Sequence, residues 1–581
     1  MMGEQADYRA PLQRSARPEP VEGRDGAGRR LSRRRLLSGT VLGAGAVAGL
    51  SLLGCSSTKG KQPAASGQAS GQAAPKRGGM LRVSLVSDPG TLDFQQETVV
   101  EGLFVLMPLY SQVLRQVPND WGKLQGDLAT KWEPSADGSK WTFTVRQDVK
   151  WHDGRPLTVD DIVYSLNRLI NPPPGYKGGN GGNLRGAVAS VSKVDEARFL
   201  VELKRPAISF LQSLGMPYIR ILPKHILEPI DQNEKSRSLK PSELIGSGPF
   251  RFKSYERGSS FVYERNPDYY LKGQPYLDGI TYYYIPDVNT QLESLRTGRL
   301  DLDGLSATLK ASQGKQVQSA APDRIVVKSG GNARLVGLFF NTSASPFQDL
   351  RLRQAVHLAL NRQQMIELIQ EGQGIITPPL TSFDSVYPTD HYLQEPGYRA
   401  DKTADLAQAK QLVDAATGGK GLDVTFSVIS TSSYPDYVQL QRQQLAPIGI
   451  RVQIQTLDSA VGEARYNAGQ VTVVGAHPCA VPFNDPDSMI ARYFLPTGER
   501  YWSKWQNQQL IDLYSKESVD LDEASRAKQL RQVADILDQE LPAIGLTDSL
   551  RKTILSKSVH GIDVLPPSVN ADWRFDWVSL A

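Results

Sequence analysis

The sequence has few of the residues that specialised sites need. It holds 2 Cys in 581 residues, which excludes a disulfide framework and any Cys-rich zinc or iron–sulfur site. Its six His residues are far apart, and no two stand four residues apart, where one helix could offer two metal ligands. It also lacks a G-x-S-x-G elbow, a Walker A loop, an H-E-x-x-H pair and a C-x-x-C pair. We therefore expect no enzyme, no bound metal and no cofactor.

Excess positive charge is nearly absent beyond the N-terminus. The whole chain carries +5, but residues 1–54 hold nine Arg and five acidic residues, a net of +4. The remainder has 57 basic and 56 acidic residues, a net of +1. Nucleic-acid binding needs basic residues interleaved with aromatic ones, so we exclude it for this nearly neutral part. Its length predicts roughly three domains.

Residues 1–54 have the pattern of an export signal. Arg33 and Arg34 precede an uncharged stretch rich in Gly and Ala, and they resemble a twin-arginine signal. The stretch ends in Leu-Leu-Gly before Cys55, which resembles a lipobox whose Cys is lipidated. The alternative is an uncleaved signal anchor, because about 18 apolar residues can span a bilayer. Residues 55–78 form a predicted flexible tether, so we expect an extracytoplasmic body anchored through Cys55 to the outer face of the cell membrane.

Strand and helix patterns alternate after residue 79, which predicts α/β domains. Trp141, Phe143 and Val145 share one face of a predicted strand. Thr158 to Asp161 has the capping-box pattern and starts a predicted helix. Asp349 can cap another. A strand, a helix and a strand predict a β-α-β unit over 424–429, 436–445 and 452–457.

Four segments together point to one family. Residues 87–93 contain a P-x-T-L-D motif, and 128–165 and 245–305 are two long blocks of family-typical sequence. Residues 340–362 add the pattern Asn-Thr, Pro-Phe and Arg-Gln-Ala. These segments resemble family 5 extracytoplasmic solute-binding proteins, the peptide/nickel-type receptors of ABC importers. The resemblance covers residues 79–581.

The resemblance implies a type II periplasmic-binding-protein-like fold, which is bilobal and α/β with an additional small domain. Lobe I would comprise 79–112, 245–330 and 547–581, the extra domain 113–244, and lobe II 331–546. A monomeric receptor of this kind binds a peptide or another small solute between its lobes and presents it to the membrane permease. ATP would be hydrolysed on another chain.

The sequence departs from the family at one informative place. Peptide-binding relatives often carry an Asp three residues before an Asp-Pro pair, where it binds the peptide's amine. Here Asp485-Pro486 is present, but the third residue back is Pro482. Either Asp485 or Asp487 has taken over, or the ligand lacks that amine. Asp487 has a simpler interpretation as the cap of a helix over 488–494.

The predicted ligand-binding residues follow from loops that face the other lobe. We expect His477, Cys479, Phe483 and Asp485 in one such loop, Tyr434 at a helix start and Trp502 as a stacking wall; the full set is Asp88, Thr91, Asn341, Tyr434, His477, Cys479, Phe483, Asp485 and Trp502. Peptide is the default ligand. His477 and Cys479 leave open a metal or metal-chelate receptor, and an opine or a sugar also remains an alternative ligand. A secreted hydrolase would require Asp88, His477 and Asp485 to converge.

Overall fold

The computed structural model describes residues 75–176, 181–304, 310–330, 334–380, 386–431, 433–480, 485–565 and 571–581. The predicted export signal with Arg33 and Arg34, and the predicted lipidation site Cys55, lie outside these residues, as do Pro482 and Phe483. Among the helices of the described part, none has the length and apolar character that crossing a bilayer requires.

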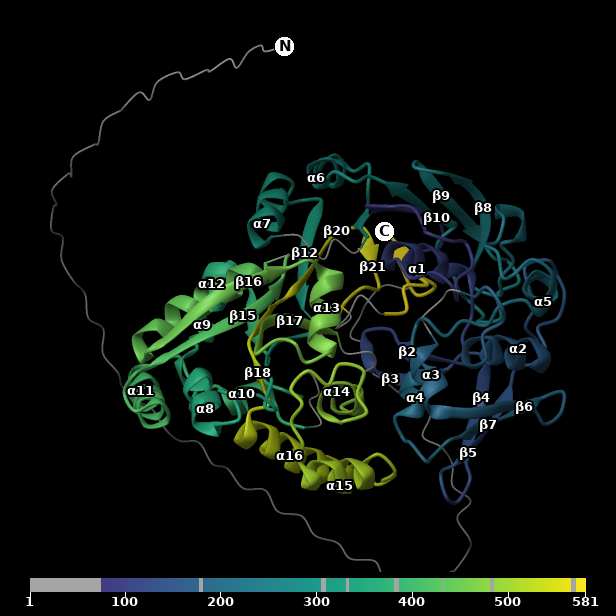
Figure 1. Cartoon of the computed structure of the whole chain (residues 1–581). Helices are drawn as coiled ribbons and strands as arrows, with labels where there is room; N and C mark the ends of the chain where they lie inside the picture. The colour runs from purple at the N-terminus through teal and green to yellow at the C-terminus, as the bar shows by residue number, and fades with distance from the viewer. Residues whose placement is uncertain are drawn as a thin grey trace, which may run out of the picture. The chain divides into compact units, whose positions relative to one another are not determined.

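The first large sheet has seven strands drawn from both ends of the described chain. Its order is β12-β20-β11-β1-β10-β9-β8, and β1 pairs in parallel with β10 and β11 while the outer pairs are antiparallel. Leu81, Val83 and Leu85 alternate along β1 and are fully buried, as their spacing predicts. In Figure 1 the yellow strand β20 runs beside the teal strand β12. The strands are β1 Met80–Leu85, β8 Phe250–Glu256, β9 Ser260–Arg265, β10 Gly279–Tyr284, β11 Leu302–Asp303, β12 Ile325–Gly330 and β20 Arg551–Ser556.

A four-stranded antiparallel sheet forms a second unit. Its order is β4 (Ala129–Pro134), β5 (Lys140–Val145), β7 (Arg198–Leu203) and β6 (Val188–Lys193). Phe143 on β5 stacks on Phe199 of β7 with ring centroids 4.9 Å apart. Helix α2 (Val159–Ile170) packs on this sheet and starts at the capping box of Thr158 and Asp161. The predicted strand and the predicted helix are both confirmed.

A five-stranded sheet forms the third unit, in the order β16, β15, β17 (Val473–Ala480), β13 (Arg334–Phe340) and β18 (Ala543–Gly545). Strand β15 (Leu422–Ile429) pairs in parallel with β16 (Ile450–Leu457), and helix α12 (Tyr434–Leu445) connects them. Gly449 ends that connection with φ of 86°, a left-handed conformation that glycine adopts without strain. This confirms the predicted β-α-β unit. Helix α8 (Leu350–Ala359) starts at Asp349, whose carboxylate accepts the Arg351 N–H, as predicted.

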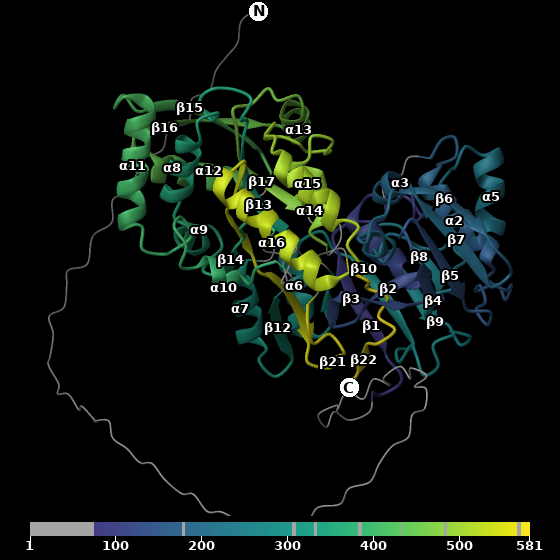
Figure 2. The ribbon, with the colours of Figure 1, turned by 90° about the horizontal axis from the view of Figure 1, so that it is seen from below.

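Each of these sheets has its own hydrophobic core. One core surrounds the five-stranded sheet, a second surrounds β1, β9 and β10 together with the C-terminal residues Trp573 and Phe575, and a third lies on the four-stranded sheet. Helices α8, α11 (Thr403–Thr417) and α12 gather beside β15 and β16 in the green part of Figure 2. Separate cores are what allow such units to move against one another as bodies.

The remaining elements complete these units. The other strands are β2 Leu114–Val117, β3 Asp120–Gly126, β14 Gly374–Ile376, β19 Thr547–Ser549, β21 Val559–His560 and β22 Ser579–Leu580. The other α-helices are α1 Val100–Leu106, α3 Gly182–Ala187, α4 Phe210–Leu214, α5 Lys224–Asn233, α6 Val288–Thr297, α7 Ala311–Ala320, α9 Arg362–Ile369, α10 Thr389–Tyr392, α13 Ser459–Asn467, α14 Asp487–Met489, α15 Gln508–Glu517 and α16 Glu523–Glu540. Short 3₁₀ turns span Met107–Leu109, Pro241–Glu243 and Ala446–Ile448, and a π-helical turn spans Ile490–Phe494.

Candidate functional site

Asp88 and Thr91 follow β1, as predicted. They lie at the edge of the sheet where the parallel strands β1, β10 and β11 end. Open α/β sheets commonly bind ligands at this edge. The Asp88 carboxylate accepts the Tyr255 hydroxyl at 2.9 Å and the Gly258 N–H at 2.8 Å. The Thr91 hydroxyl donates to Ser238 at 2.8 Å. Both side chains therefore fix the turn after β1, and Asp88 remains only half-buried.

Asn341 and Tyr434 lie in the five-stranded unit. Asn341 directly follows β13, and its amide donates to the carbonyls of Gly469 and Val471 at 3.0 and 3.2 Å. This buried side chain ties the end of β13 to the segment that enters β17. Tyr434 starts α12, as predicted, and is buried.

His477 and Cys479 lie on a strand, which corrects the expectation of a loop. They are two residues apart on β17, opposite Gly337 and Leu335 of β13, so their side chains leave the same face of the sheet. The strand was not predicted because Pro478 stands between these two residues, and proline is uncommon inside a sheet.

His477 and Trp502 meet in a buried aromatic cluster. Their ring centroids are 4.5 Å apart, and Trp502 also contacts Phe339, Tyr466 and Tyr493 edge-on. The Trp502 indole N–H donates to Asn467 Oδ1 at 2.7 Å. Trp502 is only 2% exposed. It therefore acts in this structure as a core side chain whose polar atom has a partner.

A chain of charged groups borders this cluster. The carboxylate of Glu463 lies 2.8 Å from His477 Nε2 and 3.3 Å from Arg500 Nη2, and the Arg500 guanidinium lies over the Trp502 ring. Burial lowers the pKa of His477 even though Glu463 opposes that shift. Burial raises the pKa of Cys479 to about 12. At neutral pH the imidazole is therefore neutral and the thiol protonated, so Cys479 is a poor nucleophile and a poor metal ligand.

Asp485 belongs to a second, separate cluster. Its two carboxylate oxygens accept from Arg526 Nη2 and Nη1 at 2.6 and 2.8 Å, a bidentate pair. Arg526 also reaches Asp487 at 3.1 Å and Glu517 at 3.0 Å. The sequence suggested that Asp487 caps the helix that follows, and the structure shows that it does not. Helix α14 already includes Asp487, and the Asp485 carboxylate accepts the Asp487 N–H.

Three carboxyl groups around one guanidinium cannot all be ionised at low cost. Burial first, and then the hydrogen bond and charge of Asp487, raise the pKa of Glu517 well above its usual range. Neither Glu517 Oε1 nor Asp487 Oδ2 has another partner among the described residues. A proton held by Glu517 and donated to Asp487 satisfies both atoms. Sequence reasoning missed Glu517 and Arg526 because helical spacing alone does not show that they face a distant loop.

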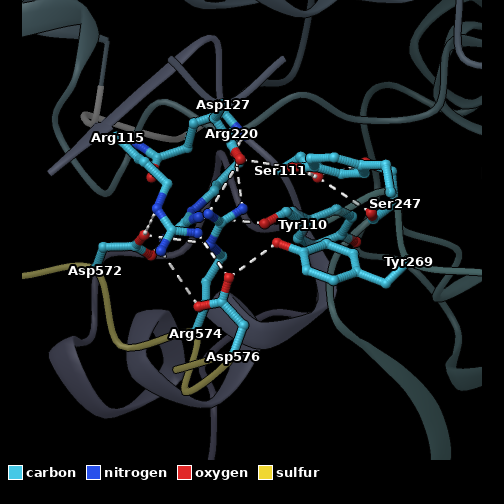
Figure 3. A network of polar contacts seen from close by, with 12 residues as sticks. Tyr110, Ser111, Arg115, Asp127, Arg220, Ser247, Tyr269, Asp572, Arg574 and Asp576 are labelled. Atoms are coloured by element: carbon cyan, nitrogen blue, oxygen red, sulfur yellow. Dashed lines mark hydrogen bonds and ion pairs between the residues drawn. The ribbon is translucent and has the colours of Figure 1, made fainter. Parts of the chain in front are cut away.

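A third buried network is structural and was also missed. Arg115, Arg220 and Arg574 interleave with Asp127, Asp572 and Asp576, as Figure 3 shows. The closest N–O distance is 2.7 Å in each of the pairs Arg115–Asp576, Arg220–Asp572 and Arg574–Asp127. Tyr269 donates to Asp576 at 3.0 Å. Three positive and three negative charges balance, and they join the C-terminal segment to residues 115–220.

The two chemical alternatives can be compared with this geometry. Asp88, His477 and Asp485 have three different sets of partners, so the described contacts do not form the trio that a hydrolase would need. Within the described ranges, no three His, Cys, Asp or Glu side chains are grouped so as to hold a metal ion.

Comparison with known proteins identifies the class. Residues 123–501 match the family described as "Bacterial extracellular solute-binding proteins, family 5 Middle", and the chain belongs to this family of solute-binding proteins. Di/tripeptide-binding protein 2 of Pseudomonas aeruginosa is 26% identical over 490 residues, covering 79% of this chain and 88% of the relative. Heme-binding protein A of Haemophilus influenzae is 26% identical over 460 residues, covering 75% and 80%. The structure of HbpA2 from Haemophilus parasuis superposes with a TM-score of 0.76 at 22% identity, over 87% of this chain and all of that chain. The fold is therefore the bilobal type II fold predicted from the sequence.

Proposed function

We propose that the protein is the lipid-anchored receptor of an ABC importer and that it captures oligopeptides or a related small solute between its lobes. The observation that carries this proposal is the family match over residues 123–501. A di/tripeptide-binding relative aligned over 88% of its length supports a peptide as the default ligand.

Capture and release follow from the two-lobed fold. A ligand that contacts both lobes binds the closed form better than the open form, and so shifts the population toward closure. The closed receptor then delivers its solute to the membrane permease. Energy would come from ATP hydrolysed on another chain, since this sequence contains no phosphate-binding loop.

The division into lobes is part of the same proposal. Lobe I takes residues 79–112, 245–330 and 547–581, the extra domain 113–244, and lobe II 331–546. The separate hydrophobic cores of the three sheets support it. The predicted ligand contacts Asp88 and Thr91 would then come from lobe I and the others from lobe II.

Anchoring is proposed from the N-terminal sequence. Arg33 and Arg34 would direct export, Cys55 would carry the lipid, and residues 55–78 would hold a monomeric body at the outer face of the cell membrane. Mass spectrometry of the mature N-terminal peptide tests this. An acylated Cys55 supports the anchor, and an N-terminus that still begins at Met1 refutes it.

A metal chelate is the second candidate ligand, because a relative is a heme-binding protein. Mass spectrometry of the solute released from protein purified from its native host distinguishes the candidates. Peptides of defined length support the proposal, while a chelate, an opine or a sugar replaces its ligand class. Thermal shift then checks the solute, because a ligand at 100 times its Kd stabilises the protein by about 2.7 kcal/mol. Absence of any solute, together with no thermal shift from peptides, chelates, opines or sugars, refutes the receptor.

A further inference from the structure

The loop after β7 contacts the end of helix α15. Arg205 Nη2 donates to the Tyr514 hydroxyl at 2.9 Å, and its guanidinium carbon lies 5.3 Å from the centre of the Tyr514 ring. Three residues on, the Ile208 N–H donates to the Ser518 carbonyl at 2.9 Å. Tyr514 packs in the core of the five-stranded sheet, whereas β7 belongs to the four-stranded sheet. These bonds therefore join two separately cored units.

The C-terminal end of α15, where Tyr514 and Ser518 lie, also contacts Arg526 through Glu517. The Glu517 side chain is fully buried against Arg526, and Arg526 Nε also approaches the Glu517 carbonyl at 3.3 Å. The Ser518 N–H donates to the Tyr514 carbonyl at 3.0 Å. The Arg526 cluster thus holds Glu517, the residue directly before Ser518, and the helical bond from Ser518 to Tyr514 links the two residues that accept from the loop.

The charge of that cluster favours a cation at the position of Arg205. Even with one proton shared among them, the three carboxyl groups of Asp485, Asp487 and Glu517 carry one negative charge more than the Arg526 guanidinium balances. Burial and then the charge of Asp487 raise the pKa of Tyr514 to about 12, although Arg205 opposes the shift. Asp487 and Arg205 therefore both act on the same hydroxyl.

The contact is also small enough to be reversible. Its polar contacts among the described residues are two hydrogen bonds and one cation–π contact, and Arg205 is exposed. A receptor that admits solute between its lobes has to break and remake any bond that crosses between them. A contact of this size can do so, whereas a large apolar interface would hold the units together permanently.

We propose that the Arg205–Ile208 loop and the Tyr514–Ser518 end of α15 form a latch that holds the four-stranded unit against the five-stranded unit when the receptor closes. The Asp485–Asp487–Glu517–Arg526 cluster positions the receiving side. This inference rests on the proposed receptor function, because a latch matters only in a protein that opens and closes.

Hydrogen–deuterium exchange of the full chain, measured without added solute, tests the latch. Arg205→Ala removes a hydrogen bond from a charged donor, so exchange in peptides covering 205–214 and 508–520 is expected to rise about tenfold. Tyr514→Phe keeps the ring and should produce a smaller rise in the same two peptides. Arg198→Ala is the matched control, because Arg198 pairs with the exposed Asp195 on the same β7 hairpin and should change neither peptide.

Two further variants separate the latch from its support. Glu517→Gln keeps an N–H that can donate to Asp487 and should exchange like the wild type, whereas Glu517→Ala should behave like Arg205→Ala. Small-angle scattering should show a larger radius of gyration for Arg205→Ala. If Arg205→Ala does not fold, the same comparison is made with Tyr514→Phe. Exchange no faster than in Arg198→Ala in either peptide, or an unchanged radius, overturns the latch. The receptor proposal fails by a different observation, the absence of any bound solute and of any thermal shift in the wild-type protein.

Discussion

Replacing Asp572 by Asn should destabilise the protein more than any substitution of an exposed ion pair. Asp572 is 1% exposed and lies among three arginines, with Arg220 Nη2 at 2.7 Å, Arg574 Nε at 3.2 Å and Arg115 Nε at 3.8 Å. The substitution leaves three buried guanidinium groups facing two carboxylates. Breaking a buried pair in this way costs about 3–5 kcal/mol of unfolding free energy.

The pKa of Asp572 reflects the same interaction. Burial opposes its ionisation, but Arg574, Arg220 and Arg115 together lower its pKa from 3.8 to about 2. This shift corresponds to about 2 kcal/mol. Because the folded-state pKa is depressed, that stability is present above pH about 4 and is lost as the pH falls toward about 2.

Urea unfolding followed by tryptophan fluorescence measures the effect. Asp120→Asn is the matched control, because Asp120 pairs with Lys123 on the surface, where both side chains are about half exposed or more. It should change the unfolding free energy by less than about 1 kcal/mol. A double variant, Arg220→Met with Asp572→Leu, should recover part of the loss because it removes both members of one pair. If Asp572→Asn were no more destabilising than Asp120→Asn, the network would not hold the C-terminal segment in place.

Three further predictions concern the cluster around His477. Cys479 should resist iodoacetamide at pH 8 in the folded protein and react in urea, because burial raises its thiol pKa to about 12; peptide mass spectrometry separates it from Cys55. Trp502→Ala should lower the unfolding free energy by about 3–5 kcal/mol, and Trp502→Phe by less, in urea titrations; a loss below about 1 kcal/mol would contradict a core role. Burial depresses the pKa of His477 below 6.5, so part of the folded-state stability should be lost as the pH falls through and below that value. His477→Gln should remove that part, and an unchanged pH dependence would show that His477 does not titrate on unfolding.

Local patterns predicted the elements but not their long-range partners. The alternation in Trp141, Phe143 and Val145, and the capping box at Thr158, correctly placed a strand and a helix, because both signals act within a few residues. The resemblance to a family then supplied the order of the units. Neither source could show that strand β20 pairs with β12 and β11, since such pairing depends on tertiary packing.

The candidate site was harder to predict because its polar side chains bind one another. Asp485 looked free in the sequence, yet Arg526, 41 residues away, occupies both of its oxygens. His477 was predicted in a loop, yet it lies on β17 and is buried against Glu463 and Trp502. No spacing rule identifies such partners, because they approach from helices and turns whose packing is decided elsewhere in the chain.

These internal bonds bear on which carboxylate a cationic ligand group would meet. A carboxylate has about four acceptor positions. Asp485 is buried and uses three of these positions for the two Arg526 bonds and the Asp487 N–H, so its charge is already paired with a cation. Asp88 accepts two neutral donors, Tyr255 and the Gly258 N–H, and is only half-buried. It can therefore accept a further cation without losing either bond. Of the two predicted acidic contacts, we therefore propose Asp88 as the one that meets a ligand's positive charge.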